Sequence, residues 1–196
     1  MRVDQSQMIV QAARRLVTKK GSGFTTQELI KEAQVALQTF YRHFTTKDEL
    51  ILAVIEDMVG QTAQTARAAA TDIASPLDRL RFYIASVLDG PANDEDRQSA
   101  QFLAIEHWRL LARYPDEMAR VSLSYADLLC EAITEAMKAG LIGAQDAKTT
   151  AYLVTHLVRS VFMHRAFMTA EEPGDQVAEA VWAFCVAGLR GPRPAD

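Results

Sequence analysis

The sequence has few of the residues that mark a secreted, disulfide-stabilised or membrane-spanning protein. Its only two cysteines, Cys130 and Cys185, each lie inside an apolar helical pattern, which indicates buried core residues rather than a disulfide framework. No apolar run reaches the roughly eighteen residues that a transmembrane helix needs. Asp4 and Gln5 interrupt the start of the chain, where a signal peptide needs a continuous apolar stretch. We therefore expect a cytoplasmic protein.

Motifs of catalysis and metal binding are also missing. The chain has no Gly-rich phosphate loop and no nucleophile elbow. His107, His156 and His164 lack the close spacing of metal ligands. Glu106 and His107 are adjacent, so on a helix they would point about 100° apart. We expect no catalytic residue, no metal and no cofactor.

Hairpin dipeptides with alternating apolar flanks are absent too, and apolar residues recur every three or four positions. This periodicity, with Ala, Leu, Glu and Arg abundant, predicts an all-α protein. The polar segment 92–97, "ANDEDR", is expected to be a mobile loop. The expected helices cover residues 4–19, 25–33, 36–44, 46–70, 75–89, 98–113, 116–139, 146–168 and 175–189.

What the chain does contain is an uneven distribution of charge. Residues 1–50 hold eight Lys or Arg and five Asp or Glu, a net charge of +3, whereas the other 146 residues hold thirteen and twenty, a net charge of −7. A basic head on an acidic body suits a protein that meets phosphate with its amino-terminal part. We place the boundary near residue 60, which gives domains of residues 1–60 and 61–196.

The head carries the signals of a helix-turn-helix. Thr25 with Glu28, and Thr46 with Glu49, are spaced as capping boxes at helix starts. Between them, Gln34 would take a left-handed conformation in a tight turn. Two short helices joined in this way and packed on a third form the motif whose second helix enters the major groove of DNA.

The second of these helices carries side chains that suit a base-reading surface. Phe40 and Phe44, four residues apart, would face the core and leave the opposite side to the groove. Gln can pair with adenine, Arg with guanine, and Thr or Leu can contact a thymine methyl group. The base-reading candidates are Leu37, Gln38, Thr39 and Arg42; those for phosphate are Tyr41, His43, Lys47 and the helix start at Thr25 and Thr26. The alternative is an ordinary helical hairpin whose aromatic residues are all core.

Several spacings agree with one family pattern: Thr25 or Thr26, Leu29, Ile30, Ala33, Val35, "TFYRHF", Lys47 and Leu50. On these residues, segment 5–55 resembles the DNA-binding domain of the tetracycline-repressor (TetR) family of bacterial transcription regulators. Two positions depart from the pattern. Gln34 stands where the family usually has Gly, and Ala36 stands where it usually has Ser or Thr. Each departure costs about 1 kcal/mol in a turn or cap of this kind.

The resemblance implies that the rest of the chain is an all-helical domain that binds a small effector and dimerises through its last two long helices. The segments 151–168 and 177–189 are apolar around most of their circumference, which suits a four-helix bundle between two copies. The alternative is that other helices of the same chain cover them. The interface candidates are Val154, Leu157, Val161, Val181, Phe184 and Leu189.

Aromatic side chains with polar tips are candidates for the effector site. The alternative for each of them is a core residue, because aromatic residues at helical spacing pack in cores more often than in pockets. The candidates are Phe82, Tyr83, Phe102, His107, Trp108, Tyr125, Phe162 and His164.

Together these expectations describe a homodimeric repressor that binds a palindromic operator and is released by a small apolar or amphipathic molecule. Helix 47–70 would carry the change between effector and DNA. An activator, or a regulator without a small ligand, fits the same residues. A different class of protein, a helical enzyme or sequestering protein whose hairpin only resembles the motif, is the alternative. The sequence names neither the effector nor the operator.

Overall fold

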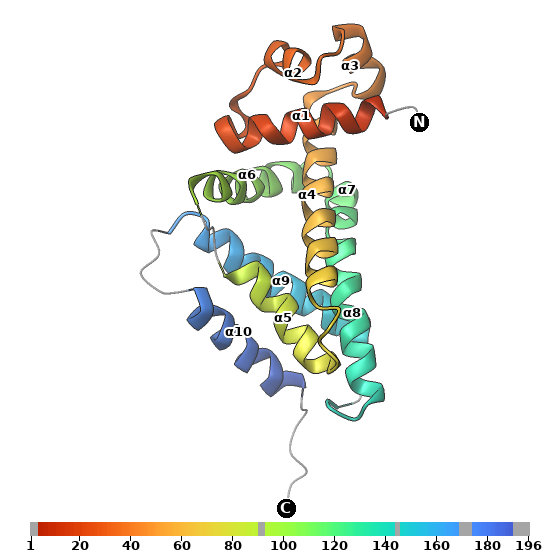
Figure 1. Cartoon of the computed structure of the whole chain (residues 1–196), viewed down its shortest axis with the longest axis vertical. Coiled ribbons are helices and arrows are strands. Elements are labelled where there is room, and N and C mark those ends of the chain that lie inside the picture. Colours follow the sequence, from red (N-terminus) through yellow and green to blue (C-terminus); the bar gives the residue numbers. More distant parts are fainter. Residues whose placement is uncertain (1–3, 90–92, 144–145, 169–173, 190–196) are drawn as a thin grey trace, which may run out of the picture. The chain divides into compact units, whose positions relative to one another are not determined.

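The computed structural model describes residues 4–89, 93–143, 146–168 and 174–189 (Figure 1). Over these ranges the regular secondary structure is helical, with no strand, which confirms the all-α prediction. No helix in the described ranges combines the length and the apolar character that crossing a bilayer requires.

The chain divides into two compact units, and each unit combines segments that are distant in sequence. The head unit comprises Met1–Val59 and Pro91–Val121, and the body unit comprises Gly60–Gly90 and Ser122–Asp196. The first division lies beside the boundary that we placed at residue 60. Segment 91–121 joins the head unit, although chain order had led us to place it in the body. This grouping depends on contacts between residues far apart in sequence.

The head unit is built around its first helix, α1, which contacts α2, α3 and α6. One side of α1 buries Ile9, Ala13 and Val17 in a continuous apolar core. The helices and the short 3-10 helix of this unit are α1 (Gln5–Lys20), η1 (Gly21–Gly23), α2 (Thr26–Ala33), α3 (Leu37–His43), the first part of α4 (Lys47–Ala69), α6 (Asp94–Leu111) and α7 (Pro115–Val121).

The start of α6 corrects the prediction of a mobile loop at 92–97. Residues from Asp94 onward are helical, and the Asn93 side chain caps the helix by accepting a hydrogen bond from the Asp96 backbone nitrogen at 2.9 Å. Asp94, Glu95 and Asp96 form the first turn, where negative charge is favourable next to the helix dipole. The polarity of this segment is therefore that of a helix start.

The body unit contains α5 (Pro76–Leu88), α8 (Leu123–Lys138), α9 (Ala147–Arg165) and α10 (Gly174–Leu189). Helix α5 contacts the other three, and α8 also packs along α9 (Figure 1). Two predicted caps are confirmed: Ser75 accepts from the Asp78 nitrogen, with Pro76 as the first helical residue, and Asp146 accepts from the Thr149 nitrogen.

The predicted helix 116–139 is divided in the structure. Helix α7 ends at Val121 and α8 begins at Leu123, with Ser122 between them. The Ser122 side chain does not cap α8, and its Oγ accepts a hydrogen bond from Arg159 on α9 instead. The break also marks the second division between the two units. No glycine or proline signals it in the sequence.

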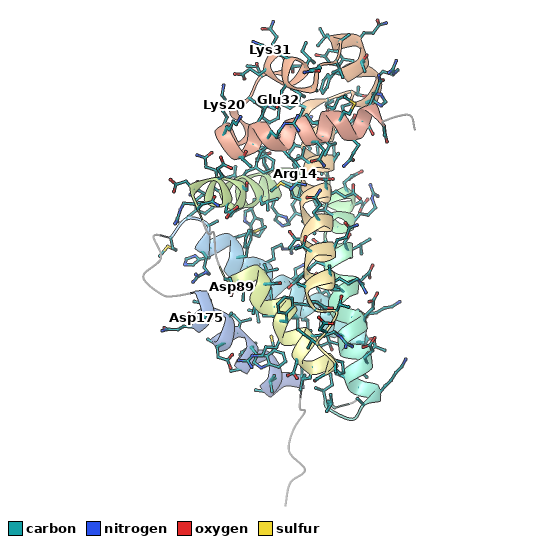
Figure 2. The ribbon with its side chains drawn as sticks, in the orientation of Figure 1. Arg14, Lys20, Lys31, Glu32, Asp89 and Asp175 are labelled. Carbon is teal, nitrogen blue, oxygen red and sulfur yellow. The ribbon has the colours of Figure 1, made fainter. Side chains whose placement is uncertain are left out.

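A close backbone approach fixes the start of α10 against the end of α5. A Cβ atom added to Gly174 would lie 2.2 Å from the backbone oxygen of Asp89, so only glycine fits there. Figure 2 shows Asp89 at the end of α5, next to Asp175 in the first turn of α10.

Candidate nucleic-acid interface

Helix α2 starts with the predicted capping box. The Thr25 hydroxyl accepts from the Glu28 backbone nitrogen at 3.2 Å, and the Glu28 carboxylate accepts from the Thr25 backbone nitrogen at 2.8 Å. The second predicted box is only half formed. Thr46 accepts from the Glu49 nitrogen, but the Glu49 carboxylate accepts from the nitrogen of Thr45. Both helix starts are thus held by side chains close in sequence.

The turn between α2 and α3 places Gln34 in the left-handed conformation, which costs free energy for a residue other than glycine. Gln34 has φ 53° and ψ 41°, and among the described residues it is the one non-glycine with positive φ. The Val35 nitrogen donates to the Ile30 carbonyl at 3.1 Å and closes the turn. Ala36 is the N-cap of α3 and offers no side-chain hydrogen bond. Both departures from the family pattern therefore occupy strained or uncapped positions.

Helix α3 has one buried side and one exposed side. Phe40 is buried in the head core, and Phe44 just beyond the helix packs near it, with 6.1 Å between ring centroids. On the other side, Leu37 and Tyr41 are 47% and 56% exposed, although both are apolar enough to be buried. Gln38 and Arg42 are exposed beside them, one helical turn apart. His43 is exposed and Thr39 half-buried at the edges of this face.

Arg42 on this face has a partner that sequence reasoning missed. Its Nη2 donates to Oε1 of Gln5, the first residue of α1, at 2.5 Å. Gln5 leaves the charge of Arg42 unneutralised and restricts where its guanidinium can point. No local signal could have revealed the contact, because the two residues are 37 positions apart.

The Lys47 ammonium group has partners inside the head. Nζ donates to the carbonyl oxygens of Ser22 and Phe24, at 2.7 Å each, and lies 4.4 Å from the centroid of the Phe24 ring. Burial against this loop lowers the pKa of Lys47 from its ordinary value. Lys47 therefore ties the start of α4 to the loop before α2. It can offer at most one further proton to a phosphate.

The amino-terminal end of α2 already holds a negative charge. Glu28 accepts hydrogen bonds from Lys20 and from the Thr25 backbone, and these partners lower the pKa of its carboxyl to about 2. The Glu28 carboxylate thus occupies part of the position that a phosphate would take at this helix start. Thr25 is exposed and Thr26 half-buried, so they remain candidates for phosphate contacts through their hydroxyl groups and backbone.

Several basic residues of the head already have carboxylate partners. Arg14 pairs with Asp57 at 2.5 Å, Arg15 with Glu32 at 2.7 Å, and Lys20 with Glu28. Figure 2 shows Glu32 on the side of α2 towards α1, with Lys31 directed away from α1. In the described part of the head, Lys19, Lys31 and Arg42 have no carboxylate oxygen within 4.0 Å. These three, with Lys47, whose hydrogen-bond partners are carbonyl oxygens, carry positive charge that is available to a nucleic acid.

Residues 9–54, which contain this arrangement, match the sequence profile of the bacterial regulatory proteins of the tetR family. The head is that of a TetR-family regulatory protein. The matched residues run from α1 through the helix-turn-helix to the first two turns of α4. No curated protein matches the chain.

Solved structures extend the likeness over the whole chain. The fatty acid degradation regulator FadR from Bacillus halodurans superposes with a TM-score of 0.73 at 16% identity, over 97% of this chain and 98% of that one. A bacterial regulatory protein in the tetR family from Rhodococcus RHA1 gives a TM-score of 0.61 at 22% identity, over 97% and 100%. AibR, solved with isovaleryl coenzyme A and operator DNA, gives 0.59 at 20% identity, over 97% and 100%. At such identities the likeness establishes the fold.

The effector candidates do not form one cluster inside either unit. Phe102 and His107 are buried in the head unit, where Trp108 is largely exposed. Tyr83 and Tyr125 are buried in the body unit, and the Tyr125 hydroxyl donates to the Tyr83 carbonyl at 2.9 Å. Burial raises the pKa of Tyr125. The remaining candidates are in the body unit: Phe82 and Phe162 are half-buried and His164 is exposed.

The dimerisation candidates also fall into different environments. Val154, Val181 and Leu189 are buried within the body unit, so they offer little surface to a second copy. Leu157 and Val161 are half-buried, whereas Phe184 is 72% exposed. Large apolar side chains that we did not select, Tyr152 and Leu153 on α9, are more than half exposed. Both helices are apolar on most sides, so periodicity could not tell their outer face from their inner one.

The described residues contain no group of three or more His, Cys, Asp or Glu side chains placed to hold a metal ion.

Proposed function

We propose that this protein regulates transcription by binding a palindromic operator as a homodimer, and that a small apolar or amphipathic effector releases it from DNA. One observation carries the proposal. In a TetR-family head, α3 is anchored by Phe40 and presents Leu37, Gln38, Tyr41 and Arg42 to solvent as one face. The protein would act by binding rather than catalysis, and DNA as its partner implies a cytoplasmic location.

The exposed face of α3 suits the major groove. Gln38 can pair with adenine and Arg42 with guanine, while Leu37 can contact a thymine methyl group. Tyr41 and His43, with Lys19 and Lys31, can reach the phosphate backbone. Two heads reading successive major grooves would lie about 34 to 36 Å apart.

Homodimerisation follows from apolar surface that a single copy leaves exposed. We revise the candidate surface to Tyr152, Leu153 and Leu157 on α9 and Phe184 on α10, because these side chains are at least partly accessible. Exposed aromatic and aliphatic residues of this size are typical of obligate interfaces. Val154, Val181 and Leu189 would support this surface from inside the body unit.

Release from DNA would be a population shift. An effector that binds one arrangement of the dimer more tightly lowers operator affinity by its difference in affinity between the two arrangements. Inside the head unit, Arg109 of α6 and Arg113 just after α6 both pair with Asp48 in the first turn of α4. These ion pairs would make α6 and the start of α4 move together. Because AibR was solved with isovaleryl coenzyme A and operator DNA, acyl-coenzyme A thioesters are the first effectors to test.

A DNA titration tests the proposal. Operator candidates are selected from a random DNA pool by the purified full-length protein and then titrated at two salt concentrations against random DNA. Gln38→Ala and Arg42→Ala should each relax specificity by about 1 to 3 kcal/mol. Lys138→Ala, an exposed charge on α8, serves as the control and should leave specificity unchanged.

The Gln5–Arg42 contact adds a sharper variant to the same titration. Gln5→Ala should lower the discrimination between operator and random DNA less than Arg42→Ala does, because it frees the guanidinium without removing it. Equal losses of affinity for operator and random DNA in Arg42→Ala would refute its base-reading role. Failure of the selection, together with turnover of a bound small molecule, would instead favour a helical enzyme.

A further inference from the structure

Helix α9 contains an arginine, Arg159, that differs from those of α4 and α5 in the body unit. Arg67, Arg79 and Arg81 each pair with a glutamate, namely Glu131, Glu135 and Glu179. Arg159 is half-buried, and no carboxylate oxygen of a described residue lies within 4.0 Å of it. Its Nη1 donates to the Ser122 hydroxyl at 3.1 Å. A buried cation without a counter-charge is unfavourable, so this arrangement indicates a missing partner.

Desolvation of the guanidinium supports the same reading. Burial lowers the pKa of Arg159 from its ordinary value, and the Tyr152 side chain, on the same helix, offsets this only in part. An incoming anion would restore the electrostatic interaction that water no longer provides.

One turn earlier on α9, the side chain of Thr155 is in an unusual environment. It is only 4% exposed, and its hydroxyl has no hydrogen-bond partner among the described residues. Three other threonines of the body helices do have an acceptor: Thr134 donates to the Cys130 carbonyl at 2.7 Å, Thr150 to the Asp146 carbonyl at 2.8 Å, and Thr149 to the Asp146 carboxylate. Buried hydroxyl groups in native proteins nearly always have a partner. The Thr155 hydroxyl is therefore free to bind one.

Arg159 meets Ser122 where α9 packs on α8, and helical spacing places Thr155 on the same side of α9. Thr155 and Arg159 are four residues apart and share one side of α9, and half-buried Phe162 follows on that side in the next turn. Ser122 contributes from the start of α8. Along α9, the polar groups of Thr155 and Arg159, with the Ser122 hydroxyl, are thus followed by the aromatic ring of Phe162. This order matches a molecule with a polar head and an apolar tail.

We propose that Arg159, with Ser122 and Thr155, binds the anionic group of an amphiphilic ligand, a carboxylate or a phosphate joined to an apolar chain. The planar guanidinium can donate two parallel hydrogen bonds to such a group, which an ammonium cannot do. The Thr155 hydroxyl supplies a further donor, and the chain lies towards Phe162. The site rests on the proposed function only in that the ligand is taken to be the effector.

The test uses three probes with one apolar chain length: decanoate, decanoyl-coenzyme A and the neutral decan-1-ol. Binding to the full-length protein is measured by titration calorimetry. Wild-type protein should bind at least one of the anionic probes about tenfold or more tightly than decan-1-ol, as a charge-assisted hydrogen bond predicts. Preference for decanoate identifies a carboxylate site, and preference for decanoyl-coenzyme A alone identifies a phosphate site.

Four variants separate ligand binding from structure. Arg159→Gln should abolish the preference for the anion, and Arg159→Lys should restore only part of it. Thr155→Val should lower the affinity for the anionic probe several-fold. It should not lower thermal stability, because valine leaves no unpartnered hydroxyl. Arg81→Gln, which removes an arginine already paired with Glu179, is the control and should bind like wild type.

Three results would overturn the site: no preference for either anion in wild type, an unchanged preference in Arg159→Gln, or a change in dimerisation as the only effect of Arg159→Gln. The last result would mean that Arg159 pairs with a carboxylate of a second copy. Operator titration of the same preparations without ligand keeps the two proposals apart. Operator binding without anion preference refutes the site alone, and anion preference without operator binding refutes the regulatory function alone.

Discussion

The head unit and the body unit use their charged residues in different ways. In the head, two acids of the ion pairs are largely enclosed and have several partners: the Asp48 side chain, 14% exposed, pairs with Arg109 and Arg113. Asp57, 15% exposed, pairs with Arg14 and accepts hydrogen bonds from Gln7 and Gln11. In the body, the glutamates that pair with Arg67, Arg79 and Arg81 are 54%, 54% and 56% exposed.

The helices of the two units also differ in length. Helices α2 and α3 have eight and seven residues, too few to bury much apolar surface, whereas the described body helices α5, α8, α9 and α10 have 13 to 19. A short element needs specific polar contacts to hold its position. Long amphipathic helices can rely on apolar burial, with exposed ion pairs that contribute about 0 to 1 kcal/mol each. The head therefore depends on particular residues, and the body on a pattern.

The largest expected effect tests whether apolar burial is equally important in both units. Phe40→Ala in α3 and Leu80→Ala in α5 remove buried side chains, and each should lower the free energy of unfolding by about 2 to 5 kcal/mol. Urea unfolding followed by circular dichroism measures both. Tyr41→Ala, at an exposed site on α3, is the control and should stay within about 0.5 kcal/mol of wild type. A small effect of Phe40→Ala alone would mean that the head core tolerates a cavity.

An ion-pair comparison between the units should give the next largest difference. Asp57→Ala leaves Arg14, Gln7 and Gln11 without their shared acceptor, and we expect a loss of about 2 kcal/mol in unfolding free energy. Glu179→Ala in the body removes an exposed partner of Arg81 and should cost less than about 0.5 kcal/mol. Thermal melts of the two variants at one salt concentration compare them directly. Similar losses would contradict the distinction drawn between the units.

A substitution at the N-cap of α3 should stabilise the head. Ala36→Ser places a capping hydroxyl at the start of α3, where none acts now, and should raise the free energy of unfolding by about 1 kcal/mol. Ala139→Ser, at a helix C-cap on α8, is the matched control and should change little. If Ala36→Ser stabilises the head but weakens operator binding, the uncapped start of α3 serves DNA recognition.

The smallest expected effect concerns acid. Hydrogen bonds from Lys20 and Thr25 lower the pKa of Glu28 from its ordinary 4.5 to about 2. The Glu28 carboxylate is therefore protonated at a lower pH in the folded protein than in the unfolded chain. The resulting stabilisation is complete above pH 4.5 and is lost as the pH falls towards about 2. Wild type should therefore lose slightly more stability over this range than Glu28→Gln. Melting temperatures of both proteins at a series of pH values provide the measurement, and parallel curves would contradict the assignment.

The sequence by itself determined the features that depend on near neighbours. Caps such as Thr25 and Ser75 act over three residues, and the turn at Gln34 is defined by the helices on either side of it. The buried spacing of Phe40 and Phe44 left Gln38 and Arg42 for the exposed side of α3. Helical class, the helix-turn-helix and the charge of the head were therefore predictable, because each rests on periodicity or capping within a few residues.

Only the tertiary structure decided what depends on residues far apart. The grouping of 91–121 with the head, the hydrogen bond from Arg42 to Gln5 and the engagement of Lys47 with the loop before α2 all join distant segments. The outer face of α9 was equally undetermined, because apolar residues lie on most sides of this helix and their periodicity does not tell the outer face from the inner one. The sequence also could not show that the Thr155 hydroxyl has no hydrogen-bond partner among the described residues or that the described partner of Arg159 is the Ser122 hydroxyl, because both depend on how the helices pack. Burial and pairing are properties of the packed helices rather than of any one segment.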